Sequence, residues 1–415
     1  MKILWIVNTI FPYPSQQLGM KKNPFGGWLI GLANKCIQEE NIELAIATVY
    51  SGSDFKEFKD EKITYYLIPG APAIKYNKKI EEYWKKVNKE FKPDIVHIHG
   101  SEFTHGLGYV NSCQNTRVIL EIQGMVSVYA KVYYANLPIS EIIKNITLRD
   151  IVRFDTIIQA RKKFIKRGKF EIALIKKVNN IIGRTTWDYA NVKAINPSTK
   201  YYKLNETLRK AFYNNIWNYD KIEKHSIFCS QASYPIKGLH YMLDAMYILK
   251  QKYPDVKLYI AGNDIIHKKS KTSGYGKIIL NKIKKYNIEN NVIFTGILNE
   301  NEMVERLLKT NVFALPSSIE NSSNSLGEAM LLGMPCVASN SGGTMDILKH
   351  KEEGLLYPYT EPAVLAHYIE QLFENKELAE EYGKKARTTA LNRHNPETNT
   401  KNVIEIYEKI LKEEK

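Results

Sequence analysis

The sequence predicts two doubly wound α/β domains, each built on a parallel sheet with helices on both faces. Three observations support this class. Short runs rich in β-branched residues alternate with helical patterns along nearly the whole chain, as in βαβ units. The runs are continuously apolar, which is typical of strands buried on both faces. The alternation stops at a polar stretch, residues 213–224, and then restarts, dividing 415 residues into two domains of ordinary size.

The first series of elements fills the N-terminal half. A helix is predicted between the first two strands, at residues 28–37, because Leu29, Leu32, Ala33 and Cys36 keep helical spacing. The predicted strands of this half are residues 3–7, 44–49, 95–99, 118–122 and 180–182.

The second series follows the polar stretch. Residues 239–249 are predicted to form a helix, and residues 396–415 a final helix with Val403, Tyr407 and Ile410 on one face. We therefore expect an N-terminal domain at 1–215 and a C-terminal domain at 222–396, with the last helix, about 397–415, packing back on the first. The predicted strands of the second half are residues 226–229, 256–261, 292–295, 312–314 and 336–339.

Composition narrows the class of protein. The four cysteines lie far apart and form no Cys-x-x-Cys pair, which argues against a disulfide framework or structural zinc and favours a reducing compartment. No run of 18 apolar residues is present, so no spanning helix is expected. The apolar start is interrupted at Asn8 without a small-residue cleavage site, and we interpret it as a buried strand. We expect the protein in the cytoplasm.

The positive charge is large and unevenly spread. The net charge is +15 with a pI near 9.2. Residues 137–177 hold eleven Lys or Arg against four Asp or Glu. This segment is interpreted either as a solvated helical face or as a contact with anionic lipid at the inner face of the membrane. A nucleic-acid partner is not expected, because no recognisable DNA- or RNA-binding motif is present.

One segment combines features that suit a phosphate-bearing ligand. A polar turn carrying Glu320 follows the strand at 312–314, and a helix opens near Ser325 with Glu328 in its first turn. A helix N-terminus offers N–H groups and a positive dipole end to a phosphate, and carboxylates accept hydrogen bonds from ribose or sugar hydroxyls. Glu328 could equally complement the helix dipole, with Glu320 solvated. The residues alone leave both interpretations open.

The wider pattern resembles the retaining glycosyltransferases of family four. The eight-residue step from Glu320 to Glu328 is followed by Ala-Met, Gly-Met-Pro and then Ser-Gly-Gly-Thr, in the order found in that family. The resemblance covers essentially the whole chain. It implies the GT-B fold, in which two Rossmann-like domains face each other across a cleft.

The resemblance also implies roles for individual residues around the helix. Glu328 would hold the ribose of the donor nucleotide, and Glu320 would face the donor sugar. The backbone N–H groups around Asn324, Ser325 and Leu326 would meet the diphosphate.

Two other loops enter the predicted donor site. Paired glycines, Gly26 and Gly27, stand between the first strand and its helix and let the backbone approach a phosphate closely. In the second domain, Lys237 matches a family lysine that neutralises the departing diphosphate. Gln231 stands where the family has an arginine, which leaves the predicted site one cation short.

Three residues of the first domain complete the candidates. Gln123 replaces a family histidine near the donor sugar and cannot act as an acid or base near neutral pH. Arg184 is a hypothetical replacement for the missing cation, the alternative being a local ion pair with Asp188. His99 either contacts the ligand or packs in the core. His97 and His99 share one strand face, but no matching ligand cluster follows, so no metal is expected.

The resemblance implies a retaining, metal-independent hexosyltransferase that needs no cofactor. Its donor would be a nucleotide sugar, expected to be UDP-linked, and its acceptor a glycan, expected to be lipid-linked, in bacterial cell-surface polysaccharide synthesis. The alternatives are a non-catalytic GT-B-like scaffold, favoured by the Gln123 and Gln231 departures, and a GT-B phosphorylase or epimerase.

Overall fold

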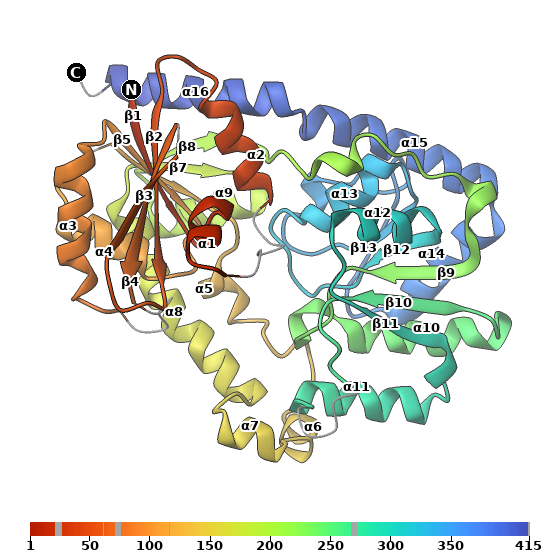
Figure 1. The fold of residues 1–415 in the computed structure, drawn as a ribbon. Coiled ribbons are helices and arrows are strands. Elements are labelled where there is room, and N and C mark those ends of the chain that lie inside the picture. Colours follow the sequence, from red (N-terminus) through yellow and green to blue (C-terminus); the bar gives the residue numbers. More distant parts are fainter. Residues whose placement is uncertain (21–26, 61, 71–75, 116, 267–271, 414–415) are drawn as a thin grey trace. The chain divides into compact units, whose positions relative to one another are not determined.

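The computed structural model describes residues 1–20, 27–60, 62–70, 76–115, 117–266 and 272–413 (Figure 1). The chain divides into two compact units. The first contains Met1–Val128, Lys163–Thr207 and His394–Lys415, and the second contains Tyr129–Lys162 and Leu208–Arg393. This division differs from the expected one in two respects: the boundary falls after Thr207, and residues 129–162 group with the second unit.

The first unit is built on a sheet whose described strands follow the order β3-β4-β2-β1-β5-β6-β7-β8. Neighbouring strands are parallel except β3, which runs antiparallel to β4 at the edge. The strands are β1 Lys2–Val7, β2 Glu43–Tyr50, β3 Lys56–Lys59, β4 Ile63–Pro69, β5 Ile95–His99, β6 Val118–Glu121, β7 Asn180–Gly183 and β8 Lys200–Lys203.

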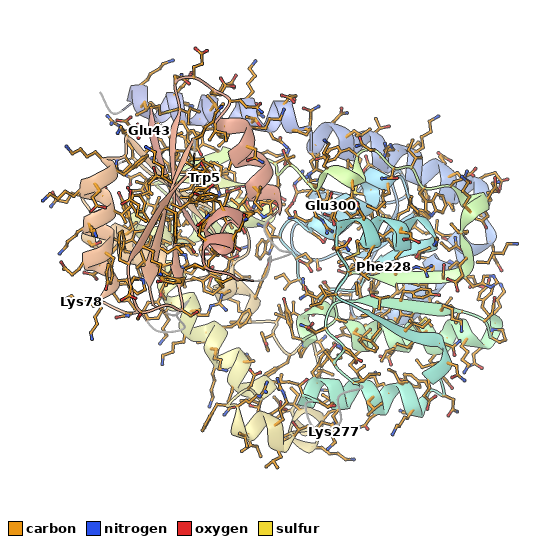
Figure 2. The ribbon with its side chains drawn as sticks, in the orientation of Figure 1. Trp5, Glu43, Lys78, Phe228, Lys277 and Glu300 are labelled. Carbon is orange, nitrogen blue, oxygen red and sulfur yellow. The ribbon has the colours of Figure 1, made fainter. Side chains whose placement is uncertain are left out.

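The second unit has a fully parallel sheet in the order β11-β10-β9-β12-β13-β14. Figure 2 shows Phe228 of β9 among the packed side chains of this unit, where it stacks on Phe313 of β12 with ring centroids 6.5 Å apart. The strands are β9 Glu223–Cys229, β10 Lys257–Ala261, β11 Val292–Gly296, β12 Thr310–Leu315, β13 Cys336–Ser339 and β14 Leu355–Tyr357.

The helices connect the strands in chain order, as expected of βαβ units. They are α1 Pro12–Gln17, α2 Gly27–Cys36, α3 Ile80–Phe91, α4 His105–Ser112, α5 Val126–Tyr129, α6 Ile139–Lys144, α7 Leu148–Val152, α8 Ile157–Lys177, α9 Thr186–Ile195, α10 Leu239–Lys252, α11 Gly274–Lys285, α12 Glu300–Leu308, α13 Asn324–Leu332, α14 Pro362–Glu374, α15 Lys376–Arg393 and α16 Pro396–Glu413. Among the described residues, none of these helices combines the length and apolar composition needed to span a bilayer.

Strand β1 shows why its sheet is covered on both faces. Successive side chains of a strand point to opposite faces. Leu4 and Ile6 belong to a buried cluster that includes Trp84 of α3. Trp5, labelled in Figure 2, belongs to a second cluster that includes Tyr407 of α16. A continuously apolar strand is therefore required here, and the predicted fold class of two parallel-sheet α/β domains is confirmed.

Each sheet contains one point where the strand order reverses. In the first unit the chain runs from β1 through β2 to the edge and returns to β5 on the other side of β1. In the second unit it runs from β9 through β10 to β11 and returns to β12 on the other side of β9. The loops that leave the carboxyl ends of these strand pairs diverge, and ligands of doubly wound sheets bind there.

Candidate functional site

The reversal point of the second unit brings two predicted site residues together. Lys237 lies in the loop after β9 and Glu320 in the loop after β12, and Lys237 Nζ donates to Glu320 Oε1 over 2.6 Å. The hydroxyl of Ser317 donates to the same oxygen over 2.7 Å. Burial lowers the pKa of Lys237, but the carboxylate of Glu320 more than compensates and raises it overall. Lys237 is thus a fixed cation at the point where a ligand is expected.

These two loops approach each other very closely at Gly238. This residue has a φ of +71°, and a Cβ built on it would lie 1.8 Å from the carbonyl oxygen of Pro316. A side chain here is therefore excluded both by conformation and by space. The backbone N–H of Ser318 donates to the carbonyl of Ile236 over 2.7 Å and joins the same two loops.

The N-terminus of α13 completes this side of the site. The helix begins at Asn324, one residue before the predicted opening, because the Ser323 side chain caps it by accepting from the Leu326 N–H. The first N–H groups of a helix have no carbonyl partner inside it. The backbone N–H groups of Asn324 and Ser325 are therefore placed to receive an anion, while the Leu326 side chain is buried.

Glu328 is held by an arginine that the sequence analysis did not single out. Arg209 Nε donates to Glu328 Oε1 over 2.6 Å, and Arg209 Nη2 donates to Oε2 over 2.7 Å. Burial raises the pKa of Glu328, and the Arg209 guanidinium opposes that rise. The bidentate pair fixes the direction of the carboxylate. Each oxygen keeps acceptor capacity for a hydroxyl group.

The remaining donor-site candidates receive less structural support. Gln231 lies in the loop after β9 with an exposed side chain. Gly27 is the exposed first residue of α2, whereas Gly26 lies outside the described residues. The roles assigned to these residues stay predictions.

Arg184 is held by several partners within the first unit, and its role as the replacement cation stays a prediction. Its side chain is almost completely buried and donates to the carboxylates of Glu121 and Glu206 and to the carbonyl of Ile122. Asp188, the alternative partner, accepts instead from the Arg184 backbone N–H over 2.9 Å. Two carboxylates already neutralise the guanidinium, so it belongs to a buried ion-pair network.

His99 is a core residue of the same network. It is 1% exposed, its Nδ1 lies 2.5 Å from Glu121 Oε2, and its ring packs on Trp5. Burial lowers the pKa of His99 to about 4, so the ring is neutral near pH 7. These contacts favour the packing interpretation of His99, and a ligand contact stays a prediction.

The same residues have the composition of a metal site. One ligand atom from each of His97, His99 and Glu121 lies within 4.8 Å of the others. The Arg184 guanidinium, however, is bound to the Glu121 carboxylate, and its charge holds the pKa of Glu121 well below its usual range despite burial. A divalent cation would be repelled by that charge. The geometry fits an ion-pair network better than a metal centre.

Gln123 follows β6 in a turn that a buried carboxylate supports. Glu171 of α8 accepts from Ser101 Oγ over 2.8 Å, from the Val126 N–H over 3.0 Å and from the Ser127 N–H over 2.8 Å. Burial raises the pKa of Glu171 to about 7 although these donors lower it. Glu171 thus fixes the start of α5, a few residues after Gln123.

Comparisons with known proteins show which sequences this chain resembles. The profile of the family described as "Glycosyl transferases group 1" matches residues 213–389. A putative glycosyltransferase of Bacillus subtilis, YtcC, is 23% identical over 312 residues, which cover 74% of this chain and 71% of that protein.

Solved structures share the whole fold. Sucrose-phosphate synthase from Thermosynechococcus elongatus superimposes with a TM-score of 0.72 at 15% identity, covering 99% of this chain and 98% of that chain. Anabaena HepE, solved in complex with UDP and glucose, gives a TM-score of 0.67 at 15% identity and covers 99% of this chain and 100% of that chain. These likenesses confirm the predicted GT-B type of fold.

Proposed function

Residues 213–389 of this chain belong to the glycosyl transferases group 1 family, and from that premise we propose how the protein acts. It transfers a hexose from a nucleoside diphosphate to a hydroxyl group of a glycan acceptor, with retention of anomeric configuration. The donor nucleotide is UDP, and the reaction uses neither a metal ion nor a cofactor.

One observation supports the proposal that the second unit binds a nucleotide sugar. The reversal point of the second sheet gathers a half-buried cation at Lys237, a helix N-terminus at Asn324 and two carboxylates, Glu320 and Glu328, within one unit. The cation and the helix N–H groups suit a diphosphate, and the carboxylates suit the hydroxyl groups of ribose and sugar. Anabaena HepE, which shares the fold, was solved with UDP and glucose bound.

The chemistry assigned to these groups is electrostatic. In the transfer, the bond between the anomeric carbon and the diphosphate oxygen breaks and a bond to the acceptor oxygen forms on the same face of the sugar. The acceptor proton passes to the departing diphosphate. Lys237 and the first N–H groups of α13 stabilise the charge that develops on that leaving group. Glu320 orients the sugar, Gln123 offers an amide to it, and no protein side chain needs to act as a base.

The acceptor is a lipid-linked glycan in bacterial cell-surface polysaccharide synthesis, reached at the inner face of the membrane. Support comes from six exposed apolar side chains within residues 139–154, around α6 and α7. Lys144 and Arg153 are exposed between them. We define these six residues as the α6–α7 patch: Ile139, Ile143, Leu148, Ile151, Val152 and Phe154. Apolar tips flanked by cations suit an anionic bilayer surface.

The test of the donor site is a thermal-shift titration of the full chain with UDP, GDP and ADP. We expect UDP to raise the melting temperature in proportion to its occupancy of the folded state. Glu328→Ala should weaken UDP binding by about 1.5–3 kcal/mol, because hydrogen bonds to a charged group are lost.

Glu305→Ala, which removes an exposed carboxylate of α12 in the same unit, is the matched control and should leave UDP affinity unchanged. Equal UDP affinity in wild type and Glu328→Ala would remove Glu328 from the site. The absence of a shift with all three nucleotides would favour the non-catalytic scaffold.

A further inference from the structure

The reversal point of the first sheet holds two residues that are not part of the predicted site. Asn8 directly follows β1, and Glu102 lies in the loop after β5. These are the two strands between which the strand order of this sheet reverses. Both side chains therefore stand where a doubly wound sheet binds its ligand.

Each of these residues has an acceptor atom that lacks a partner. Asn8 Oδ1 and Glu102 Oε2 are buried, and neither has a hydrogen-bond partner among the described residues. A buried acceptor left without a donor is costly, and native structures rarely retain one without a reason. The residues as a whole are only half-buried, so they lie at the surface of their unit.

The backbone leaves room for the two side chains to meet. Gly100, at the end of β5, has a φ of +94°. A Cβ built on it would lie 2.5 Å from Glu102 Oε2 and 2.7 Å from Asn8 Nδ2. Asn8 and Glu102 therefore converge over the same strand end, in space that any residue other than glycine would fill.

The surrounding charges indicate which kind of group would donate a hydrogen bond to Glu102. Arg167 Nε donates to the Glu102 carbonyl over 2.8 Å, and its guanidinium lies over the ring of Phe103. Burial raises the pKa of Glu102, while the backbone and the charges of Arg167 and Arg184 lower it. Arg167 already acts on this carboxylate as a cation, so a neutral hydroxyl is favoured over an ammonium group.

We propose that Asn8 and Glu102 bind hydroxyl groups of a neutral sugar acceptor, one donating to Glu102 Oε2 and another to Asn8 Oδ1. The inference rests on the proposed transferase function and adds the class of acceptor group and the residues that recognise it. Glu102 is in this view a binding residue for the acceptor, and donor binding in the second unit does not depend on it.

The experiment measures binding of simple glycosides to the full chain by saturation-transfer NMR in the presence of saturating UDP. The probes are the methyl α-glycosides of glucose, galactose and mannose, with the methyl glycoside of glucosamine as an ammonium-bearing counterpart. We expect at least one neutral glycoside to bind wild type. Glu102→Gln and Asn8→Ala should each weaken that binding about tenfold or more. Glu57→Gln, at an exposed carboxylate of β3, is the matched control and should change nothing.

Thermal shifts with UDP on the same variants separate this proposal from the proposed function. Normal UDP shifts in both variants, combined with lost glycoside binding, support the site and exclude misfolding. Unchanged glycoside binding in both variants, binding of the glucosamine derivative alone, or no glycoside binding by a wild type that responds to UDP would each overturn the acceptor site. A wild type that responds to no nucleotide would overturn the transferase instead, whatever the glycosides do.

Discussion

At the scale of single residues, Arg209 decides the charge state of the candidate ribose-binding carboxylate. Glu328 is buried and Glu300 lies near enough to raise its pKa further, so the bidentate Arg209 contact is what opposes protonation. We expect Arg209→Met to raise the pKa of Glu328. Nucleotide affinity should then fall as the pH decreases, because a protonated carboxyl accepts hydrogen bonds poorly.

The measurement is UDP affinity between pH 8 and pH 6 by calorimetry. Wild type should show a nearly flat profile, and Arg209→Met should lose about tenfold over this range, since one pKa unit corresponds to a tenfold change in protonation ratio. Arg306→Met removes another partly buried arginine of the same unit and serves as the control. Parallel profiles for all three proteins would show that Arg209 does not govern Glu328.

The same residues show how far a sequence can predict a site. Lys237, Glu320 and Glu328 were predicted because each follows a strand in a recognisable motif. Arg209 carries no local signal, since it lies in a polar linker 119 positions before its partner. The ion pairs of Arg184 carry no local signal either. Its position at a strand end was correctly recognised, but the two carboxylates that neutralise it come from other segments.

At the scale of elements, the α6–α7 patch should attach the protein to anionic membranes. Its side chains are well exposed, with Leu148 at 76% and both Val152 and Phe154 at 69%. Replacing these three residues by Gln should weaken co-sedimentation with phosphatidylglycerol vesicles at least tenfold, because each inserted apolar side chain contributes about 1 kcal/mol or more. UDP binding should be unaffected.

Ile216→Gln combined with Ile248→Gln is the control, because both residues are exposed and apolar but lie outside the patch. Vesicle binding lost equally in both sets of variants would indicate a general effect of surface polarity. If wild type fails to bind vesicles and the triple variant instead dissociates a dimer in size-exclusion chromatography, the patch is a protein interface.

Burial alone does not decide which strands the sequence predicts, because the mainly buried strand β4, Ile63–Pro69, is not among the predicted ones. The ten predicted strands lie close to their observed bounds, and most of them have a mainly buried apolar run; β11, with a single buried residue, is an exception. The edge strands β3 and β8 escaped prediction, because their short, Lys-bounded sequences are half-exposed and resemble loops. Strand β14 has only three residues, too few for a pattern.

At the scale of the whole molecule, the chain uses one topology twice. Both sheets reverse their strand order between the first strand and its later neighbour, and both gather polar side chains at that point. In the second unit these groups are charged and paired, as suits a diphosphate and its ribose. In the first unit they include unpaired acceptors, as suits a neutral hydroxyl group. The charge at each reversal point thus supports the proposal that the second unit binds the donor and the first unit binds the acceptor.

The C-terminal helix α16 packs in the first unit, beside strand β1. Substitutions on α16 therefore test how independently the two units unfold. Tyr407 of α16 is fully buried in the first unit, where its hydroxyl accepts from Trp5 Nε1 over 3.2 Å and lies 2.7 Å from His97 Nδ1. Tyr407→Phe leaves these buried groups without a partner and should cost about 1–3 kcal/mol. Tyr407→Ala adds a cavity and should cost about 3–5 kcal/mol.

Because these losses fall in the first unit, calorimetry should show one unfolding transition moved to lower temperature. The second unit should still bind UDP with wild-type affinity, and UDP should stabilise only the transition that belongs to it. Tyr368→Phe, on α14 of the second unit, is the matched hydroxyl deletion outside the first core. A single transition that moves as a whole in Tyr407→Ala, together with weakened UDP binding, would mean that the two units fold as one cooperative body.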